Sequence, residues 1–184
     1  MGWPPRFIFI SGRLAIDFAQ TGGEGGRARW ERWHTVDDLA EWAQACPQLR
    51  ITPAVTPREL ADARALREAI WASAQSLLRG APLPPDAAGV LCRTAAPPSL
   101  VPALYDGTMG WAPGATGEQV LSSVARDAIE LFGTALNARL RECQNSACAL
   151  LFVDQSRPGK RAWCTMRRCG NLSKVARYRA AHTP

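Results

Sequence analysis

Apolar residues recur three or four positions apart over much of the chain, which is the spacing that places them on one face of an α-helix. This pattern predicts helices over residues 14–19, 35–47, 56–80 and 118–142. The clearest helix start is at Thr56, where a capping hydroxyl is followed by Pro57 and then by Glu59, which can bond back to the cap. We therefore expect a mainly α fold in which the last long helix runs directly into Cys143.

The segments between these helices have less regular patterns. Residues 7–10 form a short apolar run that predicts an edge strand, and the glycine-rich residues 20–29 predict a mobile loop. Residues 80–117 are rich in proline and glycine, so we expect irregular structure there. Within them, residues 100–101 and 109–111 could pair as a minor β-hairpin around the Asp106-Gly107 turn.

Composition and charge narrow the class of protein. The 184 residues are 47% hydrophobic and include seven tryptophans, which is enough apolar surface for a packed core and excludes a disordered chain. No segment reaches the roughly twenty apolar residues of a membrane span, and the N-terminus lacks the pattern of a secretory signal. We expect a soluble, cytoplasmic protein with no membrane partner.

Positive charge is concentrated at the C-terminal end. Residues 139–184 contain ten Lys or Arg against two Asp or Glu, a net charge of +8, whereas residues 1–138 contain twelve against fourteen, a net charge of −2. A segment this basic typically meets a polyanion, offsets a local negative charge, or stays solvated.

Four of the six cysteines lie in the same basic segment. Cys143 and Cys148 form one pair, and Cys164 and Cys169 form a second pair with the same four-residue gap. Two such pairs can supply four thiolates to one tetrahedral zinc ion, so the spacing favours zinc over free thiols or disulfides. Four cysteines would close the coordination shell, which makes the zinc structural.

The residues between the two pairs fit a zinc module. Residues 150–153 and 161–163 are plausible antiparallel strands around an Arg157-Pro158-Gly159 turn, with Phe152 and Trp163 sheltering the metal. A terminal helix from Gly170 to about residue 181 would follow. The resulting order of knuckle, β-hairpin and helix is treble-clef-like.

The run Cys164-Thr-Met-Arg-Arg-Cys169-Gly170-Asn171 closely resembles the CGNR zinc-finger family. The similarity extends to residues 143–163 and 174–179, and residues 14–21 resemble the opening motif of the family's helical N-terminal domain. One departure is Leu172, which stands where the family has an arginine. The resemblance implies two domains, a helical sensor or regulatory domain at residues 1–138 and the zinc finger at 139–184, and a role in stress-induced transcription regulation.

The resemblance also implies that the zinc module touches DNA. Non-specific phosphate contacts are then expected from the basic side chains of Arg157, Lys160, Arg167, Arg168, Lys174 and Arg177. An equally weighted interpretation is that Lys160, Arg161, Arg167 and Arg168 offset the net charge of −2 on a zinc tetrathiolate. On a helical wheel, residues 172, 175 and 176 oppose Lys174 and would return to the core.

The sequence alone leaves alternatives open for the role of the zinc module and for the roles of the tryptophans and Asp17. The zinc module could serve protein interaction or homodimerisation without DNA, or it could act as a thiol switch that releases zinc on oxidation. Several tryptophans could build the core or line a pocket for a small-molecule effector, and Asp17 could cap, brace an arginine or act in such a pocket. These tryptophans are Trp30, Trp33, Trp42, Trp71 and Trp111.

No enzyme signature is present. The chain lacks a phosphate-binding glycine pattern, a nucleophile elbow and paired histidines with a catalytic glutamate. A catalytic zinc needs an open coordination position, which a four-cysteine site does not offer. We therefore expect no catalysis and no cofactor other than one structural zinc ion.

Overall fold

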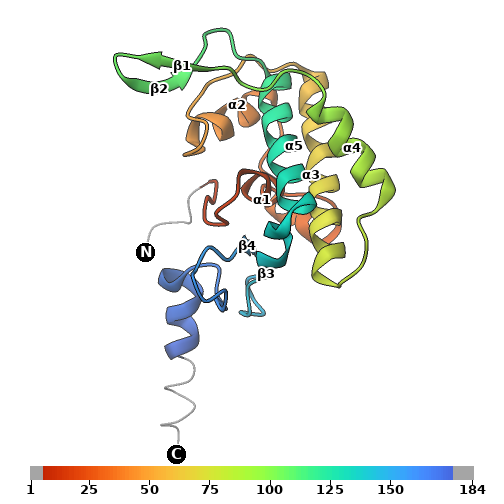
Figure 1. Ribbon diagram of the computed structural model, residues 1–184, viewed down its shortest axis with the longest axis vertical. Helices are drawn as coiled ribbons and strands as arrows, with labels where there is room; N and C mark the ends of the chain where they lie inside the picture. The colour runs from red at the N-terminus through yellow and green to blue at the C-terminus, as the bar shows by residue number, and fades with distance from the viewer. Residues whose placement is uncertain (1–5, 176–184) are drawn as a thin grey trace, which may run out of the picture.

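The structure is a computed structural model that describes residues 6–175 (Figure 1). Its helical elements confirm the prediction of a mainly α fold. They are α1 (Leu14–Ala19), α2 (Val36–Ala45), α3 (Pro57–Leu78), α4 (Pro85–Ala95) and α5 (Gly117–Gly133), with 3-10 turns at Gly25–Trp30 and Ala135–Arg139. No helix within these residues combines the length and the hydropathy that crossing a lipid bilayer demands.

Helices α3, α4 and α5 pack against one another to form the main body of the molecule (Figure 1). Both long helices begin at capping threonines, of which Thr56 was predicted. The Thr56 Oγ1 accepts the Glu59 N–H at 3.2 Å, and the Thr116 Oγ1 accepts the Gln119 N–H at 3.3 Å. Each cap satisfies a backbone donor that the first helical turn leaves without a partner.

The short helix α1 lies at the centre of the core, and all six of its residues are buried. Its Phe18 ring packs against Trp33 and Trp42, with ring centroids 4.6 Å and 5.1 Å away. These three side chains are fully buried. Two of the predicted tryptophans, Trp33 and Trp42, therefore build the core and cannot line an accessible pocket.

A β-hairpin is formed by β1 (Pro102–Tyr105) and β2 (Thr108–Trp111), which lie at the end of the molecule opposite the C-terminal segment (Figure 1). Asp106 and Gly107 both have positive φ, 48° and 78°, as the predicted two-residue turn requires. The turn prediction is confirmed, although the first strand begins at Pro102 rather than at residue 100.

Four local predictions are wrong. Residues 7–10 form no strand, and the segment 80–117 contains α4, whose Pro85 at the first helical turn is a start signal and not a break. Part of the glycine-rich segment forms the 3-10 turn Gly25–Trp30. The last long helix ends at Gly133, because Thr134 is extended and its hydroxyl accepts the Leu136 N–H.

A short antiparallel sheet, and not a long helix, connects the body to the cysteine segment. Strand β3 (Leu140–Glu142) pairs with β4 (Leu151–Val153), with Arg141 opposite Phe152. Along β4, Leu151 and Val153 are buried in the main core, whereas Phe152 between them is buried in the cysteine cluster. Because side chains alternate along a strand, β4 joins the two clusters through its two faces.

The prediction that β4 pairs with residues 161–163 is also wrong. The Asp154 carboxylate accepts the Ser156 N–H at 2.9 Å and the Arg161 N–H at 2.8 Å. These bonds curl the chain directly after β4, so the strand ladder cannot continue there. The predicted turn itself is present, with the Gly159 N–H donating to the Ser156 carbonyl at 3.1 Å and a φ of 62° at Gly159.

Candidate metal centre

The four clustered cysteines come from four different local structures. Cys143 directly follows β3, and Cys148 closes a tight turn in which its N–H donates to the Asn145 carbonyl at 2.8 Å. Cys164 ends the loop after β4, and Cys169 lies in the π-helical turn Met166–Gly170. That turn begins at Thr165, whose hydroxyl accepts the Arg168 N–H at 3.2 Å.

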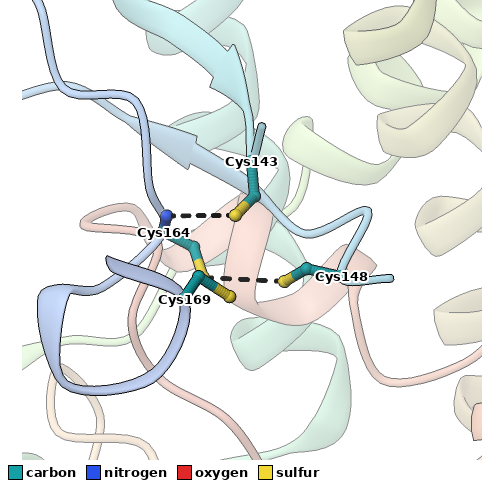
Figure 2. Close-up of side chains that lie close together, drawn as sticks. All are labelled: Cys143, Cys148, Cys164 and Cys169. Atoms are coloured by element: carbon teal, nitrogen blue, oxygen red, sulfur yellow. Dashed lines mark hydrogen bonds between the residues drawn. The ribbon is translucent and has the colours of Figure 1, made fainter. Parts of the chain in front are cut away.

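These elements bring all four sulfur atoms toward one centre (Figure 2). The Sγ atoms lie within 4.8 Å of one another, and those of Cys148 and Cys169 are each 3.6 Å from the Sγ of Cys164. A tetrahedral zinc ion with Zn–S bonds of about 2.3 Å needs sulfur atoms about 3.8 Å apart. The separations therefore fit a zinc tetrathiolate and are far longer than a disulfide bond of about 2.05 Å.

The electrostatics of the cluster favour a bound cation. Burial raises the pKa of the Cys148 thiol to about 11, and burial also raises the pKa of the Cys164 thiol. For Cys143, burial acts in the same direction, but N–H groups directed at its sulfur, first that of Cys164, lower the pKa overall. Four buried thiols this close can ionise together only when a positive ion lies among them.

Apolar and stacked side chains cover the cluster. Phe152 is fully buried against the cysteines, and Trp163 and Ile10 pack on the same cluster. The Arg161 guanidinium lies 4.6 Å above the Phe152 ring and donates to the carbonyls of Trp163 and Cys164. The predicted shelter from Phe152 and Trp163 is thus confirmed, and Arg161 braces the loop that carries Cys164.

Gly170, which follows the last cysteine, is closely packed. A Cβ at this position would lie 2.6 Å from the Sδ of Met166 and 3.4 Å from the Cδ1 of Trp163. The first distance is shorter than a Cβ contact allows, so a larger residue would displace the end of the Met166 side chain. Because that side chain is flexible and 52% exposed, it can move aside at small cost.

The junction between the cluster and the body depends on residues that sequence reasoning did not single out. The Gln20 Oε1 accepts the Leu151 N–H at 2.8 Å, and the Ser11 carbonyl accepts the Val153 N–H at 2.8 Å. The Gln155 side chain donates to the Gly12 carbonyl at 2.9 Å. No spacing rule could reveal these partners, because each bond joins residues more than 130 positions apart.

The predicted nucleic-acid residues lie on the loop and the helix of the cysteine module. Arg157, Lys160, Arg167, Arg168 and Lys174 are exposed, whereas Arg177 lies outside the described residues. Within residues 6–175, none of the five exposed side chains has an ion-pair or hydrogen-bond partner.

The apolar side of the terminal helix does not return to the core. Leu172 is 59% exposed and Val175 is 47% exposed, so the helical-wheel prediction is wrong for these residues, and Ala176 lies outside the described ones. The described part of this helix points away from helices α3–α5 (Figure 1).

Two known families match successive parts of the chain. Residues 12–135 match the ABATE family, which is described as "Putative stress-induced transcription regulator", and residues 139–182 match the CGNR zinc finger. No curated protein matches the chain. Neither family is described as an enzyme, and the cysteine cluster is that of a zinc finger with one structural zinc ion. The chain therefore belongs to the ABATE family and carries a CGNR zinc finger.

Proposed function

We propose that this protein regulates transcription by binding DNA through its zinc module. Cys143, Cys148, Cys164 and Cys169 hold one zinc ion, and the binding energy of that ion orders the module. The module comprises residues 139–184, and residues 1–138 form the domain that senses a ligand or partner. We further propose that the protein acts in the cytoplasm.

The observation that supports DNA contact is the set of exposed cations without partners. In the body, some arginines such as Arg13 and Arg67 pair with carboxylates at 2.9 Å and 2.6 Å, whereas others such as Arg50 and Arg79 have no carboxylate partner within residues 6–175. In the described part of the zinc module, no Lys or Arg lies within salt-bridge distance of a carboxylate. Arg157, Lys160, Arg167, Arg168 and Lys174 are free to neutralise phosphates.

A salt titration on duplex DNA of random sequence tests this function. Five phosphate contacts predict that log K falls against log salt with a slope of up to about −4.5. Zinc removal should abolish the binding, because the module loses its fold. Absence of binding to the zinc-loaded protein at low salt would contradict the proposal.

Single substitutions sharpen the test. Lys174→Gln should weaken binding to all sequences alike and reduce the slope by about 1. Arg58→Gln is the matched control, because the Arg58 side chain is 92% exposed and lies on α3, away from the zinc module. A slope that changes as much in Arg58→Gln as in Lys174→Gln would show that the zinc module is not the contact surface.

A protein-interaction module is the second candidate, and a specific observation favours it. Met166, Leu172 and Val175 expose 52%, 59% and 47% of their surface on the terminal turn and helix. Exposed apolar residues on one helix suit a protein partner better than a phosphate backbone. Zinc-loaded protein that self-associates, fails to bind duplex at low salt and becomes monomeric on Leu172→Lys would establish this alternative.

A further inference from the structure

A cavity of about 140 Å³ lies where the helical body meets the zinc module. The body contributes residues from α1, the glycine-rich segment and α3, and the zinc module contributes the turn at residues 147–150 and Arg168. A molecule in this cavity would touch both parts of the protein at once. Its chemistry can be inferred from the side chains that line it.

The walls on the body side are aromatic and flat. The Arg27 guanidinium lies 4.5 Å above the Trp71 ring, where the Glu68 carboxylate and the Gly22 carbonyl hold it. Trp30 also lines the cavity, and the Arg29 guanidinium lies 4.2 Å above its ring. Both tryptophans line the cavity and are only half-buried, in contrast to the core pair Trp33 and Trp42.

The polar groups of the cavity are mainly donors without acceptors. The Gln20 Oε1 is fixed by the Leu151 N–H, which leaves its buried Nε2 without a partner within the described residues. Arg32 and Arg168 line the cavity, and no carboxylate between residues 6 and 175 pairs with either of them, although the Arg32 Nε donates to the Arg6 carbonyl at 3.1 Å. Asp17 is the one carboxylate in the lining, and its Oδ1 is already occupied by the N–H groups of Ile10 and Ser11.

We propose that this cavity binds a small planar carboxylate, a one-ring aromatic acid in size, between Trp30 and Trp71 with its carboxylate toward Gln20, Arg32 and Arg168. The volume is close to the roughly 150 Å³ that accommodates a benzene ring in other proteins and is too small for a nucleotide. The aromatic walls favour a flat ring. The unpaired guanidinium groups and the amide favour an anionic oxygen group.

The position of Arg168 gives this site a regulatory consequence, which rests on the proposed DNA binding. Arg168 is one of the five exposed cations of the zinc module and directly precedes Cys169. A ligand carboxylate that holds Arg168 removes it from the phosphate-binding set. The ligand should therefore weaken DNA binding and reduce the magnitude of the salt slope by about 1.

Calorimetric titration of the zinc-loaded full chain with benzoate tests the site without DNA. We expect saturable binding of benzoate with one site per chain, and binding of uncharged benzamide at least about tenfold weaker, because benzamide loses the charge-assisted bonds. Absence of saturable benzoate binding, or equal affinity for the two molecules, would overturn the proposal.

Two neighbouring arginines provide a matched pair of variants. Arg168→Gln should weaken benzoate about tenfold or more, whereas Arg167→Gln should leave its affinity unchanged, since Arg167 is equally exposed but does not line the cavity. Zinc content and circular dichroism confirm that both variants are folded. Equal effects of the two substitutions would refute the assigned orientation of the ligand.

The two proposals can fail separately. Duplex binding with no benzoate binding would overturn the ligand site and leave the DNA proposal standing. Benzoate binding that depends on Arg168, together with no duplex binding at low salt, would support the ligand site and overturn the proposed function. If the protein binds both duplex DNA and benzoate, then benzoate should lower the affinity of the native protein for duplex DNA and should not lower that of Arg168→Gln.

Discussion

Asp17 shows how one buried residue organises the N-terminal segment. Its carboxylate accepts the N–H groups of Ile10 and Ser11 at 3.1 Å and 3.0 Å, and thereby holds the extended chain before α1. Burial nevertheless raises the pKa of Asp17 to about 6, because the hydrogen bonds do not fully replace water around the charge. The residue is 2% exposed, so this penalty is weakly screened.

The raised pKa predicts a stability that falls as pH rises. Between about pH 3.8 and pH 6 the folded state holds the Asp17 proton more tightly than the unfolded state, so raising pH through this window costs stability. The loss attributable to Asp17 is on the order of 3 kcal/mol. Urea unfolding of the native protein and of Asp17→Asn at pH 4, 5, 6 and 7 measures it.

Both proteins contain the acid-sensitive zinc site. The difference between their free energies of unfolding therefore reports the contribution of Asp17 alone. Asp17→Asn should gain stability relative to the native protein as pH rises from 4 to 6, and the difference should then stay constant to pH 7. A difference independent of pH would contradict the assignment of a raised pKa to this carboxyl group.

At the scale of elements, strand β4 is the connection that matters most. Leu151 and Val153 belong to the main core, Phe152 belongs to the cysteine cluster, and the backbone on either side bonds to Gln20 and Ser11. Three residues thus link zinc coordination to the packing of the helical body. This link replaces the continuous helix that periodicity alone would predict.

The two faces of β4 predict different consequences for two neighbouring substitutions. Leu151→Ala removes buried contacts of the body and should cost about 2–5 kcal/mol in unfolding free energy while zinc stays bound. Phe152→Ala opens the cover of the cysteine cluster and should speed zinc release to a chelator by about tenfold or more. Chemical denaturation and a colorimetric chelator assay measure the two effects.

Each variant serves as the control of the other. Zinc release that accelerates equally in Leu151→Ala and Phe152→Ala would mean that β4 does not separate the two clusters.

Local signals in the sequence were enough for some elements and not for others. The capping residue Thr56, the Asp106-Gly107 turn and the two cysteine pairs each act through neighbours a few positions away, so their structures could be predicted. The end of α5 depends on the hydroxyl of Thr134, which a pattern of apolar residues does not register. Pairing of β3 with β4 and the Gln20 bond to Leu151 are long-range contacts, which no single-sequence period encodes.

For the candidate site, residue type and spacing identified the sulfur cluster, because four clustered cysteines are typical metal ligands. Trp30 and Trp71 were two of five tryptophans that could line a pocket, but the sequence did not separate them from the core pair Trp33 and Trp42. Only the fold brings them together with Gln20 and Arg168 around one cavity. The exposure of the apolar side of the terminal helix was not predicted for a related reason. The helical-wheel prediction assumed that this helix packs against the helical body, and the sequence alone does not show whether it does.

At the scale of the whole molecule, charge and hydrophobicity are segregated. Ion pairs in the described part of the chain join residues of the body, the described Lys and Arg of the zinc module form none, and the β1–β2 hairpin exposes Leu104 and Met109 at the opposite end (Figure 1). The end with the zinc module is therefore suited to a polyanion. The body between the two ends contributes one side of the cavity.

Everything in this account depends on zinc held by the four sulfur atoms. The most direct measurement is zinc X-ray absorption on freshly purified, reduced protein together with the metal content per chain. We expect one zinc per chain with four sulfur neighbours at about 2.3 Å, and no bound zinc in Cys164→Ser while Cys92→Ser is unchanged. Substoichiometric zinc, or a first shell containing nitrogen or oxygen, would contradict the account.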